Sequence, residues 1–270
     1  MVKFDGCTEI YGIMGNPVSH SMSPAMHNRA FSQSGLNKVY VPFRVDDVEK
    51  AMDGFRALGV KGVSVTIPYK QAVIPFLDSI DPVAEKIGAV NTLVIKEGKI
   101  HGLNTDWLGA NRAVNEVRKL PGSKVLLLGA GGSARAIGFG FLEAGASITI
   151  ASRTPYRGKE LAGELGCAWH PLEEVEQLEA DVMVNATSVG MAPDFDQMVV
   201  PLEVLSQFQV VMDIVYSPLE TKLLKSAAGK GCKVINGLAM LLYQGVAQFE
   251  TWTGLTAPIL EMRQELSSRL

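Results

Sequence analysis

The chain of 270 residues lacks the features that mark membrane, secreted and nucleic-acid-binding proteins. It has no run of about eighteen apolar residues, the length that a membrane-spanning helix requires. Its first residues, Met-Val-Lys-Phe-Asp-Gly, lack the apolar core of a signal peptide. The formal net charge is only −3, so the chain has no basic excess with which to bind nucleic acid. We therefore expect a cytoplasmic protein with neither a membrane nor a nucleic acid as its partner.

Cysteine is equally scarce, with Cys7, Cys167 and Cys232 far apart in the sequence. Zinc sites usually take paired ligands about two to four residues apart, and disulfide frameworks use an even number of cysteines. Neither pattern is present. We expect free thiols in a reducing compartment and no metal site.

What the chain does have is an ordinary globular composition, with 47% hydrophobic and 20% charged residues. This length is sufficient for two domains, each with its own core. Apolar strand-like and helical segments alternate from residue 9 onward, which predicts an α/β architecture. The last segment, 238–270, is predicted to form helices that are interrupted around Gly254–Pro258.

The most informative stretch is the apolar strand at 124–128 with the glycine-rich turn and helix that follow. Glycines at 129, 131 and 132 allow backbone N–H groups to approach a pyrophosphate at the start of a helix predicted over 134–144. Glycine-rich turns also simply connect strands to helices, but strand, turn and helix stand here in the order that dinucleotide binding requires.

The end of the next strand, 147–151, indicates which dinucleotide binds. An acidic residue there would accept a hydrogen bond from the ribose of NAD, whereas this chain has the basic loop Ser152–Arg157, containing Arg153 and Arg157. Arginine side chains bind a 2′-phosphate by charge-assisted hydrogen bonds. The alternative is a solvated basic loop. The position of the loop at the end of this strand favours NADP instead.

A hydroxyl-rich loop follows the first strand, at 16–24. Ser23 is a candidate N-cap for a helix over 25–34 with Pro24 in its first turn. Ser21 precedes the cap and has no such structural role. Hydroxyl groups at the end of a strand also suit a polyol ligand. His20 and His27 are given low weight as acid–base groups, and His27 is expected to be structural.

Further polar residues follow other strands. Lys70 comes after the strand at 62–68, at the predicted start of a helix reaching residue 77, where its charge opposes the helix dipole. A solvated surface lysine is the alternative. A strand predicted over 87–95 contains Asn91, and Asp106 is a candidate cap for a helix over 107–118. By periodicity alone, Gln244 is an exposed helical residue.

These segments together resemble shikimate dehydrogenase over nearly the whole chain. The blocks that carry the resemblance are Gly15–Pro24, Val65–Lys70, Gly88–Thr92, Asn104–Asp106, Gly129–Ser133, Asn185–Gly190, and Asn236–Gly237 followed by Gln244. The resemblance departs from the family pattern at Ser64 and Ser152, where asparagine is usual.

The resemblance implies the NADP-dependent, reversible reduction of 3-dehydroshikimate to shikimate, in the shikimate pathway to chorismate and aromatic amino acids. It implies Lys70 and Asp106 as the catalytic pair. The substrate-binding residues that it implies are Lys70 and Asp106 together with Ser21, Ser23, Thr66, Asn91, Tyr216 and Gln244. The NADP contacts that it implies are Gly129, Ala130, Gly131, Gly132, Ser133, Ser152, Arg153, Thr154, Arg157, Thr187, Ile214 and Gly237.

The implied fold is an N-terminal α/β substrate-binding domain, 1–106 with 241–270, and a Rossmann-like NADP-binding domain, 107–240. The C-terminal helices would pack back on the first domain. The expected partner is a small-molecule substrate, and a homodimer is the assembly considered. We hypothesise that Lys70 protonates the carbonyl oxygen during reduction and that Asp106 orients it. Three alternatives are a quinate or dual quinate/shikimate dehydrogenase using NAD, a non-catalytic sensor of shikimate-like ligands, and a reductase of another substrate on the same scaffold.

Overall fold

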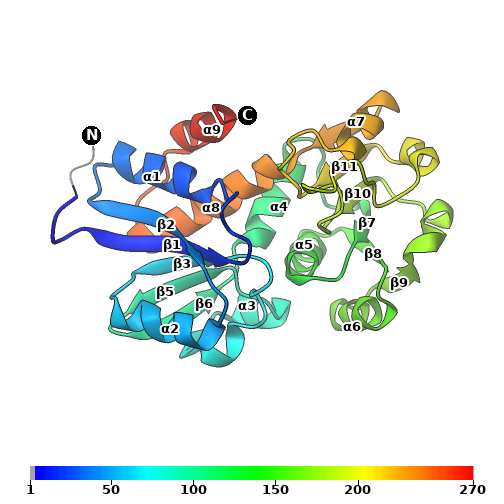
Figure 1. Cartoon of the computed structure of the whole chain (residues 1–270). Helices are drawn as coiled ribbons and strands as arrows, with labels where there is room; N and C mark the ends of the chain where they lie inside the picture. Colours follow the sequence, from blue (N-terminus) through cyan, green and yellow to red (C-terminus); the bar gives the residue numbers. More distant parts are fainter. Residues whose placement is uncertain (1–3, 270) are drawn as a thin grey trace. The chain divides into compact units, whose positions relative to one another are not determined.

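Two six-stranded sheets organise residues 4–269, the part of the chain that the computed structural model describes. Each sheet lies in its own unit of the chain. One unit runs to Thr105 and resumes at Gln244, and the other comprises Asp106–Tyr243. The α/β class predicted from the sequence is confirmed, and Figure 1 labels most of the elements of both units.

The first unit contains a mixed sheet in the order β2-β1-β3-β5-β6-β4. β1 pairs in parallel with β2 and β3, whereas β5 runs antiparallel to both β3 and β6. The strands are β1 (Glu9–Gly15), β2 (Lys38–Arg44), β3 (Gly62–Val65), β4 (Ser79–Ile80), β5 (Thr92–Lys96) and β6 (Lys99–Leu103). The tight turn between β5 and β6 contains Glu97 and Gly98, both with positive φ, which is the backbone conformation that two-residue hairpin turns favour.

Helices cover both faces of this sheet because its strands alternate apolar side chains between two layers. On one face, Met14 of β1 lies in a buried cluster with Met52 and Phe55 of α2 (Val48–Ala57). On the other, the ring of Tyr11 lies 5.2 Å from that of Phe31 in α1 (Ser23–Gln33) and 5.4 Å from that of Trp252.

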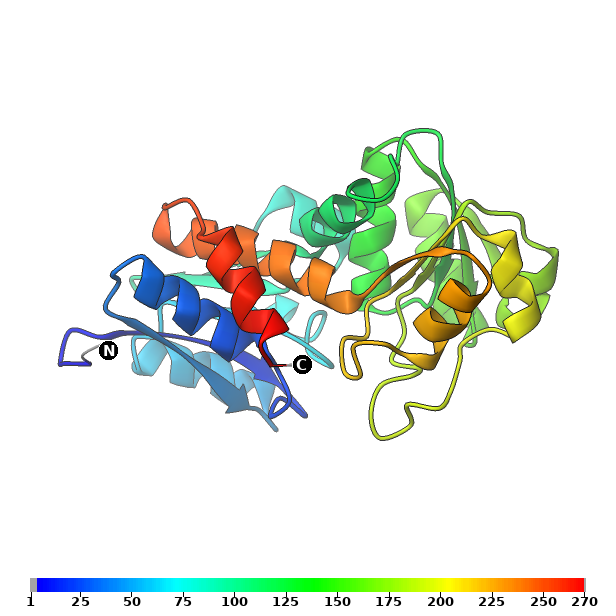
Figure 2. The same ribbon diagram turned by 90° about the horizontal axis from the view of Figure 1, so that it is seen from above.

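The C-terminal helices belong to this second layer. The interruption predicted around Gly254–Pro258 is confirmed, since α8 (Gly237–Thr253) ends and α9 (Ile259–Ser267) begins on either side of it. Phe249 of α8 packs against Phe31, with ring centroids 5.8 Å apart. Figures 1 and 2 both show α9, in red, beside α1, in blue. The C-terminal helices therefore pack back on the first unit, as predicted.

The second unit has a fully parallel sheet in the order β12-β11-β10-β7-β8-β9. The chain begins at the central β7, fills one side with β8 and β9, and then crosses over to β10. This reversal beside β7 is the switch point at which doubly wound sheets bind ligands. The strands are β7 (Lys124–Leu128), β8 (Ser147–Ser152), β9 (Ala168–Pro171), β10 (Val182–Asn185), β11 (Val210–Asp213) and β12 (Lys233–Ile235).

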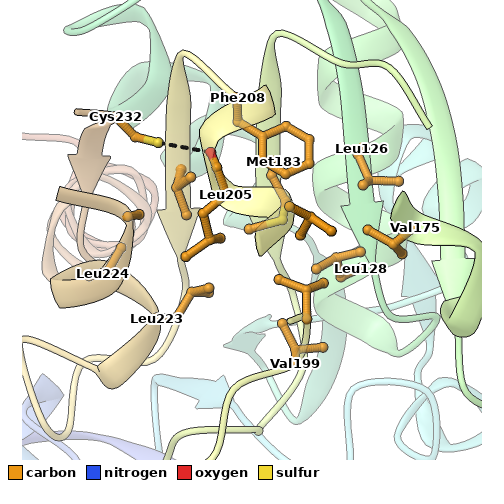
Figure 3. Close-up of a cluster of buried hydrophobic side chains, with 14 of the residues drawn as sticks. Leu126, Leu128, Val175, Met183, Val199, Leu205, Phe208, Leu223, Leu224 and Cys232 are labelled. Carbon is orange, nitrogen blue, oxygen red and sulfur yellow. Dashed lines mark hydrogen bonds between the residues drawn. The ribbon is translucent and has the colours of Figure 1, made fainter. Parts of the chain in front are cut away.

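Successive side chains of β7 point to opposite faces of the sheet and so contribute to the two layers of this unit. Leu126 and Leu128 enter the cluster drawn in Figure 3, where the Cys232 thiol donates a hydrogen bond to the backbone oxygen of Leu205. Helices α4 (Asp106–Asn115) and α5 (Gly132–Glu143) pack together, and Asn111 donates to the backbone oxygen of Gly140 at 2.8 Å. The other helices are α6 (Pro155–Leu165) and α7 (Lys222–Gly229), with 3₁₀ turns η2 (Leu172–Gln177) and η3 (Leu202–Gln207).

Two helix predictions are wrong because of proline and capping chemistry. The segment after Lys70 forms turns and the 3₁₀ helix η1 (Ile74–Phe76), not a helix to residue 77. Pro75 has no N–H to donate and its ring would clash with the carbonyl of residue 71 in an α-helix. Ser23 is not the N-cap of α1: the helix begins at Ser23 itself, and Ser23 N–H donates to Ser21 Oγ at 3.3 Å.

Three other boundaries differ from expectation. The strand predicted over 87–95 is wrong in its first half, because α3 (Pro82–Ile87) extends to Ile87 and ends at Gly88, which has φ +67°. Asp106 does not precede α4 as a cap but lies in its first turn, and α4 ends at Asn115. The basic loop after β8 is shorter than predicted, since α6 begins at Pro155. No helix in residues 4–269 is long and apolar enough to cross a membrane.

Candidate active site

Most of the residues predicted to bind substrate lie at one edge of the first unit's sheet. Ser21 and Ser23 follow β1, and Thr66 and Lys70 follow β3. Asn91 comes directly before β5, which runs antiparallel to β3, so the start of β5 lies at the same edge as the end of β3. The chain then returns to this edge at the end of β6, at Thr105. The topology therefore gathers side chains from four separate segments.

Backbone hydrogen bonds hold the two loops that carry the serines and the lysine. Asn16 N–H donates to the Ile67 oxygen at 3.1 Å, which ties the serine loop to the segment after β3. The Lys70 backbone oxygen accepts from Val90 N–H at 2.7 Å. Ser23 is buried, whereas Thr66 and Lys70 are half-buried. Lys70 is thus anchored by its backbone close to the start of β5.

Asn91 is the centre of a buried polar cluster at this edge. Its Oδ1 accepts from Thr105 N–H at 2.8 Å and from the Thr92 hydroxyl at 2.6 Å. Its Nδ2 donates to Thr105 Oγ1 at 3.0 Å and to Gln244 Oε1 at 3.4 Å. These four residues are all buried. Unpaired buried polar groups are costly, and their mutual bonding allows the cluster to exist here.

Gln244 is buried, with 8% of its surface exposed, so the exposure expected from periodicity is wrong. The physical reason is that α8 packs on the first unit, so this side of the helix is covered. Gln244 and Asn91 are 153 positions apart in the sequence. Only the family resemblance pointed to their association.

Two of the predicted residues lie in the second unit. Asp106 is buried in the first turn of α4 and is joined by one peptide bond to Thr105 of the Asn91 cluster. Tyr216 is half-buried and follows β11. Asp106 is therefore held at the point where the chain passes from one unit to the other.

The residues predicted to bind NADP lie at the carboxyl ends of five parallel strands in the second unit. Gly129 follows β7, Arg153 follows β8 and Thr187 follows β10. Ile214 follows β11 and Gly237 follows β12. Because parallel strands end at the same edge, all five segments meet there, including the switch point beside β7.

The glycine turn after β7 fits a pyrophosphate. Gly129 has φ +112°, and a Cβ there would lie 3.0 Å from Thr187 Cγ2, so only glycine is accommodated without strain. Gly131 is the N-cap of α5, and among the described residues no side-chain hydrogen bond caps this end of the helix. A Cβ built on Gly131 meets no atom within 4 Å. The turn thus has open space beside a helix N-terminus, where an anion is favoured.

The segment after β8 presents positive charge. Arg153 and Arg157 are exposed, and Arg157 Nε donates to the Tyr156 hydroxyl at 2.9 Å. Ser152 is buried, and its hydroxyl bonds within the unit, accepting from Trp169 Nε1 at 3.0 Å and donating to the Thr154 oxygen at 3.2 Å. The arginines, rather than the Ser152 hydroxyl, are the side chains presented to solvent.

Two buried residues that the sequence does not assign to the site support the last segments predicted to contact NADP. Asn185 Oδ1 accepts from the Thr187 hydroxyl at 2.7 Å and from its N–H at 3.0 Å. Asp213 Oδ1 accepts from Val215 N–H at 3.0 Å. The sequence signal that could have identified Asn185 and Asp213 is a polar residue at the end of an apolar strand.

Gly237 lies against the segment that follows β11. A Cβ at this position would lie 2.3 Å from the Ile214 oxygen, so the start of α8 can approach Ile214 only with glycine there. The close approach brings together two of the predicted NADP contacts.

In the part of the chain that the structure describes, the histidines and the acidic residues do not form a metal centre. Within residues 4–269, no group of three or more His, Cys, Asp or Glu side chains is placed to hold an ion. His27 is fully buried in α1 and stacks on Tyr40, with ring centroids 4.5 Å apart. Burial lowers the pKa of His27 to about 3, so it is neutral at physiological pH and belongs to the core, as expected.

Three family models match the chain in order. Residues 13–93 match the shikimate dehydrogenase substrate binding domain, and residues 111–215 match shikimate / quinate 5-dehydrogenase. Residues 237–266 match the shikimate 5'-dehydrogenase C-terminal domain.

Complete relatives give the same result. A shikimate dehydrogenase (NADP(+)) of Moorella thermoacetica is 44% identical, covering 98% of this chain and 95% of its own length. A crystal structure of a shikimate dehydrogenase in complex with NADP+ superposes with a TM-score of 0.91 and 40% identity, covering 99% of this chain and 97% of that one. The Thermus thermophilus shikimate 5-dehydrogenase, in complex with NADP(H) and shikimate, gives a TM-score of 0.89 at 37% identity, covering 97% and 100% of the two chains.

Proposed function

The chain belongs to the shikimate dehydrogenase family, and from this premise we infer that it is an NADP-dependent oxidoreductase that reversibly reduces 3-dehydroshikimate to shikimate. The observation that carries the inference is a match over nearly the full length to shikimate dehydrogenases named for NADP(+). The reaction is a step of the shikimate pathway, which leads to chorismate and the aromatic amino acids. The quinate- and NAD-dependent alternative is not favoured.

We propose that the polar edge of the first sheet holds the substrate. Hydroxyl, amide and ammonium groups from separate loops suit a ligand with one carboxylate and several hydroxyls. The hydrogen-bonded cluster of Asn91, Thr105 and Gln244 supports this role, because its members hold one another in place before a ligand arrives. The proposed substrate residues are Ser21, Ser23, Thr66, Lys70, Asn91, Asp106, Tyr216 and Gln244.

Lys70 and Asp106 are the proposed catalytic pair. Negative charge develops on the carbonyl oxygen as the carbonyl carbon is reduced, and a lysine ammonium can stabilise that charge and donate the proton. In the oxidative direction, the Lys70 amine accepts the proton from the substrate hydroxyl. Asp106 orients the ammonium and binds the neighbouring substrate hydroxyl.

The second unit is proposed as the NADP-binding domain. Backbone N–H groups at 129–133 would hold the pyrophosphate, and Arg153 with Thr154 and Arg157 would bind the 2′-phosphate. Ser152 supports that segment from its buried position. Thr187, Ile214 and Gly237 would line the rest of the site. When bound, NADPH supplies the hydride for the reduction.

We propose three further properties. The substrate-binding domain comprises 1–106 and 241–270, and the NADP-binding domain comprises 107–240. The enzyme acts in the cytoplasm, which agrees with three thiols that are free in the structure. It assembles as a homodimer, which light scattering of the purified protein would test.

The experiment that tests the function is a steady-state assay of the purified protein. Shikimate and quinate are each paired with NADP+ and with NAD+, and nucleotide reduction is followed by absorbance. We expect the highest kcat/KM for shikimate with NADP+. A higher kcat/KM for quinate or for NAD+ would support the alternative, and no turnover with any pair would contradict the assignment as a dehydrogenase.

A further inference from the structure

Ser64, where the family pattern has asparagine, directs its hydroxyl away from solvent into a buried hydrogen-bond chain. The side chain is 5% exposed and lies in β3. Its oxygen accepts from the Tyr40 hydroxyl at 2.6 Å, and its single hydrogen is donated to Gln248 Oε1 at 2.8 Å. The Asn91 backbone oxygen, 3.2 Å from the other end of the Gln248 amide, can only accept, so Nε2 faces Asn91 and the carbonyl end faces Ser64.

The other end of the Gln248 amide then faces the Asn91 segment. Gln248 Nε2 donates to the Asn91 backbone oxygen at 3.2 Å and to Thr92 Oγ1 at 2.9 Å. Since Thr92 Oγ1 accepts this bond, its own hydrogen is available for Asn91 Oδ1, which lies 2.6 Å away. Each side chain thus donates a hydrogen bond to the next, from Tyr40 to Ser64, then to Gln248, Thr92 and finally Asn91.

The chain ends by setting which way the Asn91 amide points. Asn91 Oδ1 receives the Thr92 hydroxyl and the Thr105 N–H, so its Nδ2 faces Gln244 Oε1. The reverse orientation would place an N–H₂ group against the Thr105 N–H and the Thr92 hydroxyl hydrogen. Opposed donors in a buried site cost the full desolvation of both groups.

We propose that Gln248 is a positioning residue for the substrate site, acting with Tyr40, Ser64 and Thr92 to keep the Asn91 N–H₂ directed toward Gln244. One Nδ2 hydrogen of Asn91 is held by Thr105 Oγ1, and the other, which makes the long 3.4 Å bond to Gln244 Oε1, is the donor that a substrate oxygen would accept in exchange. This inference rests on the proposed function, in which Asn91 contacts the substrate. It assigns a role to Gln248, which has 0% of its surface exposed and cannot itself reach solvent.

The test compares variants that remove or keep the relay with little change of shape. Thr92→Val removes the hydroxyl at nearly constant volume, and Thr92→Ser keeps it. Gln248→Met removes the amide, and Gln264→Met, on the exposed surface of α9, is the matched control. Each variant is assayed for KM with shikimate, KM with NADP+ and kcat, and its thermal unfolding is recorded.

We expect Thr92→Val and Gln248→Met to raise the KM for shikimate roughly three- to tenfold, the effect of losing one neutral hydrogen bond. The KM for NADP+ should stay within about twofold, and Thr92→Ser and Gln264→Met should resemble the wild type. A purely structural role would lower the melting temperature of Thr92→Val without this KM difference, and that result would overturn the inference. If Gln248→Met does not fold, the Thr92 pair decides alone.

Asn91→Ala separates this inference from the proposed function. If Asn91→Ala raises the KM for shikimate and the relay variants do not, only the role of Gln248 fails. If Asn91→Ala leaves this KM unchanged, the proposed substrate contact fails and the inference falls with it.

Discussion

The Asn185 side chain donates a 3.0 Å hydrogen bond to Asp213 Oδ1 and thereby joins the ends of two neighbouring strands, β10 and β11. Both residues are fully buried or nearly so. Asn185 also holds Thr187, and Asp213 also holds Val215 and accepts from the Thr221 hydroxyl at 2.7 Å. One buried pair therefore supports two of the segments that we propose to bind NADP.

Disrupting this pair should weaken NADP binding. Asp213→Ala removes the acceptor for three donors, and we expect the KM for NADP+ to rise roughly tenfold, corresponding to the loss of a buried hydrogen-bond network. The KM for shikimate should change little. Asp213→Asn should have a smaller effect, because its oxygen can still accept from Val215 N–H and its N–H₂ can donate to Thr221. Steady-state kinetics of both variants test this, and equal changes in the two KM values would contradict it.

The same aspartate should make stability depend on pH. Burial raises the pKa of Asp213 from 3.8 to about 6, although its hydrogen bonds oppose the rise. The folded state therefore binds the proton more tightly than the unfolded state, and this stabilisation is complete below pH 3.8 and lost as the pH rises through about 6. The asparagine variant lacks this titration. Between pH 4.5 and 7.5, the wild type should lose about 2 kcal/mol of unfolding free energy relative to Asp213→Asn.

Urea unfolding at the two pH values measures that difference. The comparison with Asp213→Asn cancels the contributions of all other titrating groups. A constant difference between the two proteins across this range would show that Asp213 titrates as in the unfolded chain.

Removing the Lys70 ammonium should affect turnover far more than binding. Lys70→Ala deletes the proposed proton donor, and general acid catalysis is typically worth about 10²–10⁴-fold in rate. We expect kcat to fall by that order, with a small change in the KM for shikimate. Lys86→Ala, an exposed lysine in the last turn of α3, is the control and should retain full activity. Near-normal kcat for Lys70→Ala would refute the assignment.

Replacing Arg153 should change the choice of nucleotide. Arg153→Ala removes a charged donor to the proposed 2′-phosphate, and such bonds are worth about 1.5–3 kcal/mol, so the KM for NADP+ should rise roughly 10- to 100-fold. The KM for NAD+, which has no 2′-phosphate, should be unchanged. Lys124→Ala, exposed at the opposite end of β7, controls for loss of surface charge. Parallel increases for both nucleotides would place Arg153 outside the phosphate site.

Much of this molecule could be predicted from local sequence because its determinants are local. A glycine turn between an apolar strand and a helix needs only neighbouring residues, and so does the hairpin at Glu97 and Gly98. The alternation of strands and helices predicted the α/β class. Since parallel strands end at a common edge, polar residues that follow strands predicted where ligands would bind.

What only the tertiary structure decided is how distant side chains bond to one another. Gln244 looks exposed by helical periodicity and is buried, because α8 packs on the first sheet. Gln248 and Ser64 are 184 positions apart and share a hydrogen bond. Local patterns describe which face of an element is apolar, but the direction of a buried amide depends on donors and acceptors brought to it from elsewhere in the chain. The orientation of Asn91 and the pairing of Asn185 with Asp213 are therefore properties of the folded protein alone.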